Sequence, residues 1–140
     1  MAEPATAYDK FLPEGLPDWQ RPHWDSLREH DIRVQRCTGC GVFRHVPKEI
    51  CGRCHSSEAT WSPIAGTGRV YTYTVVRRAP TPAYQVEAPY VLVHVEMDEG
   101  FRMIGSLTVG DPSAVRIGQT VRIAYDDVHD DWTILRFEPA

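Results

Sequence analysis

The pattern of apolar and polar positions divides the chain into a short helical start and a long, strand-rich remainder. Residues 1–17 hold three prolines and a glycine and show no periodicity, so we expect an irregular arm there. Pro22 suits the first turn of a helix, and Trp24 and Leu27 then lie three residues apart on one helical face. A helix this short is marginal alone, so we expect that face to pack against the rest of the molecule.

Alternation of period two marks the strands that follow. Residues 32–36 alternate and predict a strand that leads into the first cysteine. From Gly68 onward the chain turns to β-branched and aromatic runs, which predict five strands, over residues 70–76, 90–97, 101–107, 120–125 and 132–137. A helical turn at 112–115 interrupts them, and an aspartate-rich turn is expected at 126–131. The segment 77–88 has little periodicity, and loops of that length are often functional or mobile.

Five short strands with one helical interruption are typical of a small closed barrel of OB type, which often carries a helix between its third and fourth strands. We therefore predict a mainly β protein in three parts. An N-terminal arm and short helix occupy residues 1–31, a zinc ribbon occupies residues 32–65, and a five-stranded OB-fold barrel occupies residues 66–140.

The four cysteines provide the strongest chemical signal. They form two pairs, Cys37-x2-Cys40 and Cys51-x2-Cys54, with ten residues between the pairs. Two such turns direct four sulfurs to one point, which gives the tetrahedral site that zinc prefers. The alternative of two disulfides requires an oxidising compartment. The sequence shows no signal peptide and no membrane-spanning run, so we expect a reduced, cytoplasmic chain.

Four thiolates also hold a single iron, so the spacing alone leaves both metals open, and we favour zinc. A zinc ion with four protein ligands has no open position for water, so the predicted site is structural and contributes directly to folding. No cysteine then remains as a nucleophile. His45 and His55 flank the cysteine pairs, and we expect both to be solvated. His94 lies within a strand between two valines, where we expect packing rather than general-base chemistry.

Composition and charge narrow the function further. The chain is 42% apolar and 24% charged, which is an ordinary globular composition. Its net charge of −4 argues against a main role in binding the phosphate backbone of nucleic acids. Residues 32–55 nevertheless hold five basic residues and one acidic residue, which suits a small anionic ligand or an acidic partner. The aspartates of 126–131 lack the glycine and glutamate of a calcium loop, so we expect a solvated turn. The sequence contains no P-loop, dinucleotide fingerprint or nucleophile elbow.

The order of these parts resembles a family that was long catalogued as a domain of unknown function and is linked to acyl-CoA metabolism. The resemblance covers roughly residues 19 to 138. It is carried by residues 24–29, 34–41, 51–54, 68–75 and 89–93, with Pro47 and the Ile117-Gly118 step. Gly52 stands where many relatives have proline, a departure that affects none of the four cysteines.

The resemblance implies an N-terminal helix, a rubredoxin-like zinc ribbon and a C-terminal OB barrel. It also implies a non-catalytic accessory subunit of a thiolase-superfamily enzyme, either a thiolase or an aldolase that cleaves steroid side-chain acyl-CoA thioesters. Some relatives are fused to, or paired with, hotdog-fold enoyl-CoA hydratases. The barrel subunit would support assembly and the CoA-ester site, while the partner supplies the catalytic residues. The acyl chain, the stoichiometry and the partner's reaction stay open.

The segment 77–88 offers candidate contacts to acyl-CoA. Arg77 and Arg78 open it, and paired guanidinium groups suit the phosphates of CoA, while Tyr84 suits stacking on the adenine. The plainer interpretation is two solvated arginines and one interface tyrosine. The tryptophans also suggest contact with a partner protein. A chain this small does not bury four of them fully, and tryptophan is enriched in protein interfaces. These are Trp19, Trp24, Trp61 and Trp132.

Two other functions stay open at this point. Zinc ribbons and OB barrels also bind single-stranded nucleic acid, with Tyr71, Tyr73 and Phe101 as candidate stacking platforms, although the acidic balance counts against this interpretation. A rubredoxin-like electron carrier is the third hypothesis, and a colourless zinc protein would exclude it. The apolar residues of the arm, among them Phe11 and Leu16, are expected to order on a partner.

Overall fold

The structure is a computed structural model that describes residues 9–140 of the 140-residue chain. The first eight residues of the predicted arm lie outside the described residues. Residues 9–17 have no regular structure, and a 3-10 turn, η1 (Asp18–Gln20), leads into helix α1 (Arg21–Arg28). Pro22 lies in the first turn of the helix, as predicted, and the helix buries Leu27.

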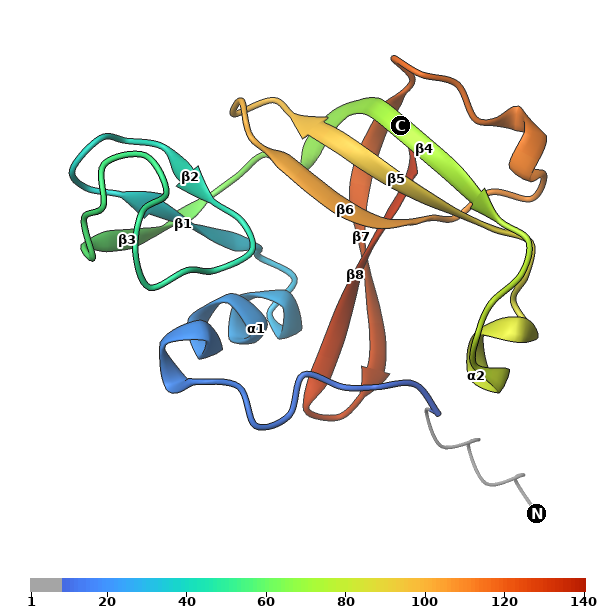
Figure 1. Cartoon of the computed structure of the whole chain (residues 1–140), viewed down its shortest axis with the longest axis horizontal. Helices are drawn as coiled ribbons and strands as arrows, with labels where there is room; N and C mark the ends of the chain where they lie inside the picture. Colours follow the sequence, from blue (N-terminus) through green and yellow to red (C-terminus); the bar gives the residue numbers. More distant parts are fainter. Residues whose placement is uncertain (1–8) are drawn as a thin grey trace.

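A small antiparallel sheet follows the helix. It contains β2 (Phe43–Arg44), β1 (Arg33–Cys37) and β3 (Ala59–Pro63), in that order across the sheet. In Figure 1 this sheet and its cysteine-bearing loops form the left-hand lobe of the molecule. The pattern at 32–36 predicted β1 but neither of its neighbours, because β2 is only two residues long and β3 does not alternate.

The rest of the chain forms a closed five-stranded barrel in the order β4-β5-β6-β8-β7 (Figure 1). Neighbouring strands are antiparallel, except that β6 and β8 run parallel where they pair and close the barrel. The 3-10 turn η2 (Pro112–Ala114) lies between β6 and β7, where the sequence predicted a helical interruption. The strands are β4 (Thr67–Val76), β5 (Tyr90–Met97), β6 (Arg102–Leu107), β7 (Thr120–His129) and β8 (Trp132–Pro139).

Alternate residues of the strands fill the barrel. Every second residue of β5 is buried, and these side chains pack against buried residues of the other strands, including Met103, Val121 and Phe137. Each such side chain contributes roughly 1.5–3 kcal/mol of transfer free energy before the entropy of ordering is counted. The period-two pattern of the sequence therefore corresponds to the inner and outer faces of the barrel.

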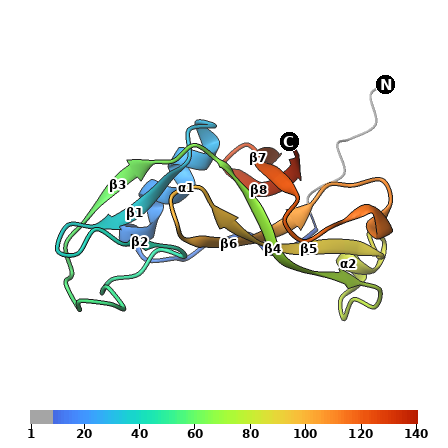
Figure 2. The ribbon, with the colours of Figure 1, turned by 90° about the horizontal axis from the view of Figure 1, so that it is seen from above.

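Ring contacts join the helix and the small sheet to the barrel. Trp24 of α1 meets Trp132 of β8 edge to face, with ring centroids 6.0 Å apart. Phe43 of β2 stacks on Phe101, which precedes β6, at 4.9 Å. Figure 2 shows the small sheet at one end of an elongated molecule and the barrel at the other. The contact between Trp24 and Trp132 packs the apolar face of α1 against the barrel, as the sequence predicted.

One loop prediction was wrong, and the other missed a short helix. Residues 126–131 are not a solvated turn, because β7 continues to His129 and the turn shrinks to residues 130–131. The strand tolerates its aspartates because partners satisfy them, such as Arg136, whose Nε lies 2.6 Å from Oδ2 of Asp126. The segment 77–88 contains a short helix, α2 (Pro82–Gln85), whose four residues are too few to show a helical period. Along residues 9–140, no helix has the length and apolar character that crossing a bilayer requires.

Candidate metal centre

The two cysteine pairs lie on two turns of the same form. The N–H of Gly41 donates to the carbonyl of Cys37 at 2.9 Å, and the N–H of His55 donates to the carbonyl of Cys51 at 3.0 Å. Both donor residues have a left-handed backbone, with φ of 80° at Gly41 and 63° at His55. The first turn begins where β1 ends, and the second lies in the loop between β2 and β3. Each spacing thus folds its two sulfurs toward the opposite turn.

The four sulfur atoms lie within 4.8 Å of one another. Cys37 Sγ is 3.5 Å from Cys54 Sγ, Cys40 Sγ is 3.6 Å from Cys51 Sγ, and no disulfide joins them. Four sulfurs at about 2.3 Å from a tetrahedral zinc ion lie about 3.8 Å from one another, close to these distances. The donor set therefore fits zinc. When bound, the ion supplies a structural cross-link and has no open position for a substrate.

The electrostatics of the cluster also favour a cation at its centre. The backbone N–H of Cys40 lowers the pKa of the Cys37 thiol to about 6, against the effect of burial. Two backbone N–H groups of the second turn lower the pKa of Cys51 as well. Although a backbone hydrogen bond from Ser56 opposes it, the adjacent sulfur of Cys37 raises the pKa of Cys54 to about 11. Four thiolates so close together repel one another unless a metal ion lies between them.

Arg44 is a buried cation beside the cysteines. Its side chain is 4% exposed, and its Nη2 donates to the carbonyls of Ser56 at 2.9 Å and Glu58 at 3.0 Å. The guanidinium also contributes to lowering the pKa of Cys37. A zinc ion with four thiolates carries a net charge of about −2, which a buried guanidinium partly offsets. The sequence predicted Arg44 to be part of a local basic patch, whereas the structure makes it an internal support of the site.

Gln35 is a second support that sequence reasoning missed. Its side chain is 6% exposed, and its Oε1 accepts a hydrogen bond from the N–H of Lys48 at 2.7 Å. This bond fixes the loop between the two cysteine pairs. No signal in the sequence marks this residue, because the alternation at 32–36 places Gln35 on the face opposite Val34, whereas the central strand β1 buries both.

His45 is not the solvated histidine that the sequence predicted. Its ring lies 5.5 Å from that of His23 and 6.4 Å from that of Phe101, and its Nδ1 is buried without a hydrogen-bond partner among residues 9–140. Burial and then the proximity of His23 lower the pKa of His45 to about 4. His23 donates from Nδ1 to the carbonyl of Arg33 at 2.9 Å, and burial lowers its pKa too. Both rings therefore act as neutral aromatic packing, whereas His55 is exposed as predicted.

The predicted CoA-contacting residues occupy one end of the barrel. Arg77 and Arg78 follow β4 directly and are exposed, while Tyr84 lies in α2 and is half-buried. The ring of Tyr84 lies 6.2 Å from that of Tyr90 and 5.3 Å from the ammonium of Lys10. Within residues 9–140, no hydrogen bond or ion pair links the arginines to the tyrosine. The guanidinium groups are open to an anion, whereas other side chains cover part of the tyrosine ring.

The three candidate base-stacking residues do not share one free surface, because only Tyr71 and Tyr73 are exposed. Phe101 stacks on Phe43 at the junction between sheet and barrel, so its prediction as a platform was wrong. Tyr71 is exposed, but the guanidinium of Arg102 lies 3.6 Å from its ring centroid. His94 packs edge to face against Tyr71 at 6.0 Å, as expected for a packed strand residue. None of the four tryptophans is fully buried, as the size of the chain implied.

Two family profiles match the chain in succession. The profile of the ChsH2 rubredoxin-like zinc ribbon domain matches residues 24–59, and that of the ChsH2 C-terminal OB-fold domain matches residues 61–126. A DUF35 domain-containing scaffold protein from Methanocaldococcus jannaschii is 35% identical over 110 residues, which cover 77% of each chain. The chain belongs to the DUF35 family. A zinc ribbon before an OB-fold is the order of parts that the sequence predicted.

Other proteins similar to this DUF35 chain are a hydratase subunit and an aldolase of known structure. The 3-oxo-4,17-pregnadiene-20-carboxyl-CoA hydratase alpha subunit of Mycobacterium tuberculosis is 34% identical over 116 residues, which are 83% of the present chain and 36% of the hydratase subunit. The chain thus spans about a third of that relative. The solved structure of the Ltp2-ChsH2(DUF35) aldolase superposes with a TM-score of 0.78 at 30% identity. The match covers 89% of the present chain and 97% of that chain.

Proposed function

We propose that this DUF35 chain is a non-catalytic accessory subunit of a thiolase-superfamily acyl-CoA enzyme, either a thiolase or a steroid side-chain aldolase. The observation that carries the proposal is the match to nearly all of a chain of the Ltp2-ChsH2(DUF35) aldolase, at 30% identity. The similarity to a CoA-ester hydratase alpha subunit supports the same substrate class. A hotdog-fold hydratase is the second kind of partner that we propose, because this relative is the alpha subunit of a hydratase.

The chemistry of the described residues suits this role. Cys37, Cys40, Cys51 and Cys54 converge on one centre, where we infer a structural zinc that holds the ribbon in shape. Large apolar side chains remain exposed elsewhere, among them Phe11 at 89%, Ile117 at 68% and Ile104 at 64%. A partner surface that covers such side chains gains the free energy of removing them from water.

Affinity capture from the native organism tests the proposal. A tagged chain is expected to retain a thiolase-superfamily protein or a hotdog-fold hydratase in near-equal amount, identified by mass spectrometry. An excess of untagged chain should displace this partner, which controls for non-specific retention. Recovery of the tagged chain alone, as a monomer, would contradict the accessory role.

Within the assembly, we infer that Arg77 and Arg78 contact the phosphates of the acyl-CoA and that the free edge of Tyr84 lies beside the adenine. Exposed guanidinium groups support the first contact, because each charge-assisted hydrogen bond is worth about 1.5–3 kcal/mol. Replacing both arginines by alanine should raise the KM of the complex for its CoA ester about tenfold or more. Tyr84→Leu should raise it less.

The matched control replaces two other exposed arginines, Arg53 and Arg69, by alanine and removes the same charge. Unchanged turnover of the CoA ester after replacement of both Arg77 and Arg78 would contradict the proposed contact with acyl-CoA. The accessory role would stand, because it rests on capture of the partner.

A further inference from the structure

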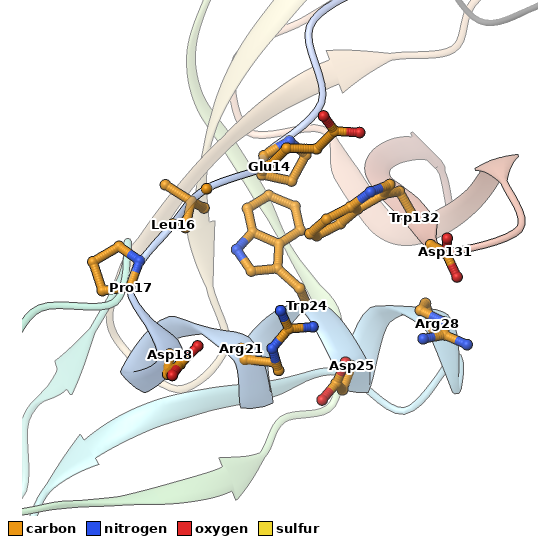
Figure 3. A pocket seen from close by; sticks show the side chains of 12 residues that line it. Glu14, Leu16, Pro17, Asp18, Arg21, Trp24, Asp25, Arg28, Asp131 and Trp132 are labelled. Atoms are coloured by element: carbon orange, nitrogen blue, oxygen red, sulfur yellow. The ribbon is translucent and has the colours of Figure 1, made fainter.

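A cleft of about 540 Å³ opens between the N-terminal arm, helix α1 and the tip of the β7–β8 hairpin (Figure 3). Two indoles form its wall. Trp24 of α1 and Trp132 of β8 meet with ring centroids 6.0 Å apart and ring planes at 79°. Both side chains are half-buried, so part of each ring faces the cleft. Neither the ribbon's metal centre nor the segment 77–88 contributes to this lining.

Four carboxylates surround the two indoles, and each comes from a different segment. Glu14 lies on the arm, Asp18 on η1, Asp25 on α1 and Asp131 at the hairpin turn. Within residues 9–140, the side chains of the first three form no hydrogen bond or ion pair. Asp131 has one distant neighbour, the Nδ1 of His129 at 3.9 Å. Within the described residues, no close ion pair therefore neutralises the charge of these carboxylates.

Two guanidinium groups also line the cleft. Figure 3 shows Arg21 and Arg28 on the helix below the indoles, with Glu14 above them and Asp131 at the side. Neither arginine forms an ion pair with residues 9–140, and no contact places either one over an indole face. Carboxylates outnumber guanidinium groups four to two in the lining, so the cleft favours a cation over an anion.

We propose that this cleft binds an arginine side chain of a partner protein. Indole is the best aromatic face for a cation, and a guanidinium stacks on it while donating to carboxylates at its edge. Among residues 9–140, no cation lies over the face of Trp24 or Trp132, so that position is open to the partner's guanidinium. The ligand class follows from the cleft itself and does not depend on the partner's identity or on acyl-CoA chemistry.

The test uses the full chain and a small probe, so that its outcome is independent of the proposed accessory role. N-acetyl-arginine amide is titrated into the zinc-bound protein, and the four indole N–H signals are followed by ¹H–¹⁵N NMR. We expect saturable shifts of the Trp24 and Trp132 signals with a millimolar Kd, while the Trp61 signal, outside the cleft, stays in place. N-acetyl-citrulline amide, which is neutral and of nearly the same shape, should cause no shift.

Substitutions in the lining sharpen the result. Glu14→Gln and Asp25→Asn should each weaken binding about threefold, and Trp132→Leu should abolish it. The matched control Glu96→Gln removes an exposed carboxylate from β5 and should change nothing. Circular dichroism confirms that each variant folds. Equal shifts with the citrulline amide, insensitivity to both carboxylate changes, or tighter binding of inorganic phosphate through Arg21 and Arg28 would each overturn the proposal.

Discussion

The imidazole of His30 lies between the carboxylate of Asp127 and the ring of Tyr125. Its Nε2 is 2.9 Å from Oδ1 of Asp127, and its ring stacks on that of Tyr125 at 4.7 Å with the planes 5° apart. The hydroxyl of Tyr125 in turn accepts from the N–H of Ile32 at 3.2 Å. One side chain thus fastens the end of the helical segment to β7, the strand whose aspartates the sequence assigned to a loop.

This contact has a consequence for acid stability. The hydrogen bond from His30, and then the one from Thr133, lowers the pKa of Asp127 below its ordinary value. The contribution to stability is therefore present above the unfolded pKa of about 3.9 and is lost as the pH falls through the folded pKa. His30→Ala should raise the pKa of Asp127 toward its ordinary value in a carboxyl-carbon NMR titration.

His129→Ala is the matched control, because among residues 9–140 its ring contacts Asp131 and forms no hydrogen bond with Asp127. It should leave the Asp127 titration unchanged. A pKa of Asp127 that is the same with and without His30 would show that the contact does not exist in solution.

Arg44 supports the metal centre from inside the protein, so its loss should be costly. Arg44→Gln removes the charge and leaves the carbonyls of Ser56 and Glu58 without their donor. We expect a loss of about 3 kcal/mol in unfolding free energy and faster removal of zinc by a chelator. Arg53→Gln is the matched control, because it removes an exposed guanidinium from the same ribbon. Equal effects of the two substitutions would contradict a specific role for Arg44.

His45 should make the fold sensitive to mild acid. Its pKa of about 4 in the folded protein lies below the unfolded value of 6.5, so the unfolded state takes up the proton first. Stability should therefore fall as the pH decreases from about 6.5 toward 4, by about 3 kcal/mol at most. His45→Phe keeps an aromatic ring and removes the unpaired nitrogen, so this variant should show a shallower dependence.

The measurement is urea unfolding between pH 6.5 and 5 with excess zinc, which limits competition from protonation of the thiolates. His55→Gln, which removes an exposed histidine from the same ribbon, serves as the control. A pH dependence in His45→Phe as steep as in the parent chain would assign the effect to another group.

Gly68 lies where β4 and β5 approach each other too closely for a side chain. A Cβ atom there would lie 2.8 Å from Cγ1 of Val95 and 3.0 Å from Cα of Met97, both in the barrel wall. Gly68→Ala should therefore cost about 1–3 kcal/mol by forcing the two strands apart. Gly110→Ala, whose Cβ would meet no atom within 4 Å, should have little effect. Thermal unfolding distinguishes them, and equal melting temperatures would refute the close approach.

Much of the fold follows from local patterns. The buried positions of β5 alternate without a break, and Pro112 follows the glycine and aspartate that end the preceding strand segment, so both elements could be predicted. The spacing of the cysteines likewise predicts that their four sulfurs meet at one point, as they do. In each case the determining interactions lie within a short stretch of the chain.

The predictions that were wrong concern contacts between distant segments. Asp127 has the sequence context of a loop residue, but His30, 97 residues earlier, lies against it. His45 has the context of a solvated residue, but Phe101 packs beside it. Arg44 belongs to a basic stretch of sequence, but its carbonyl partners cover it. No periodicity marks such positions, because tertiary burial and not local propensity decides their environment.

If this chain is an accessory subunit, it assists a CoA-ester enzyme and does no chemistry alone. This role is tested by measuring turnover of acyl-CoA by the captured partner, by this chain and by the two together at equal concentration. We expect the reconstituted pair to turn over the substrate at least about tenfold faster than the partner alone, and this chain to have no activity by itself. Full activity of the partner without this chain, or turnover by this chain alone, would contradict the accessory role.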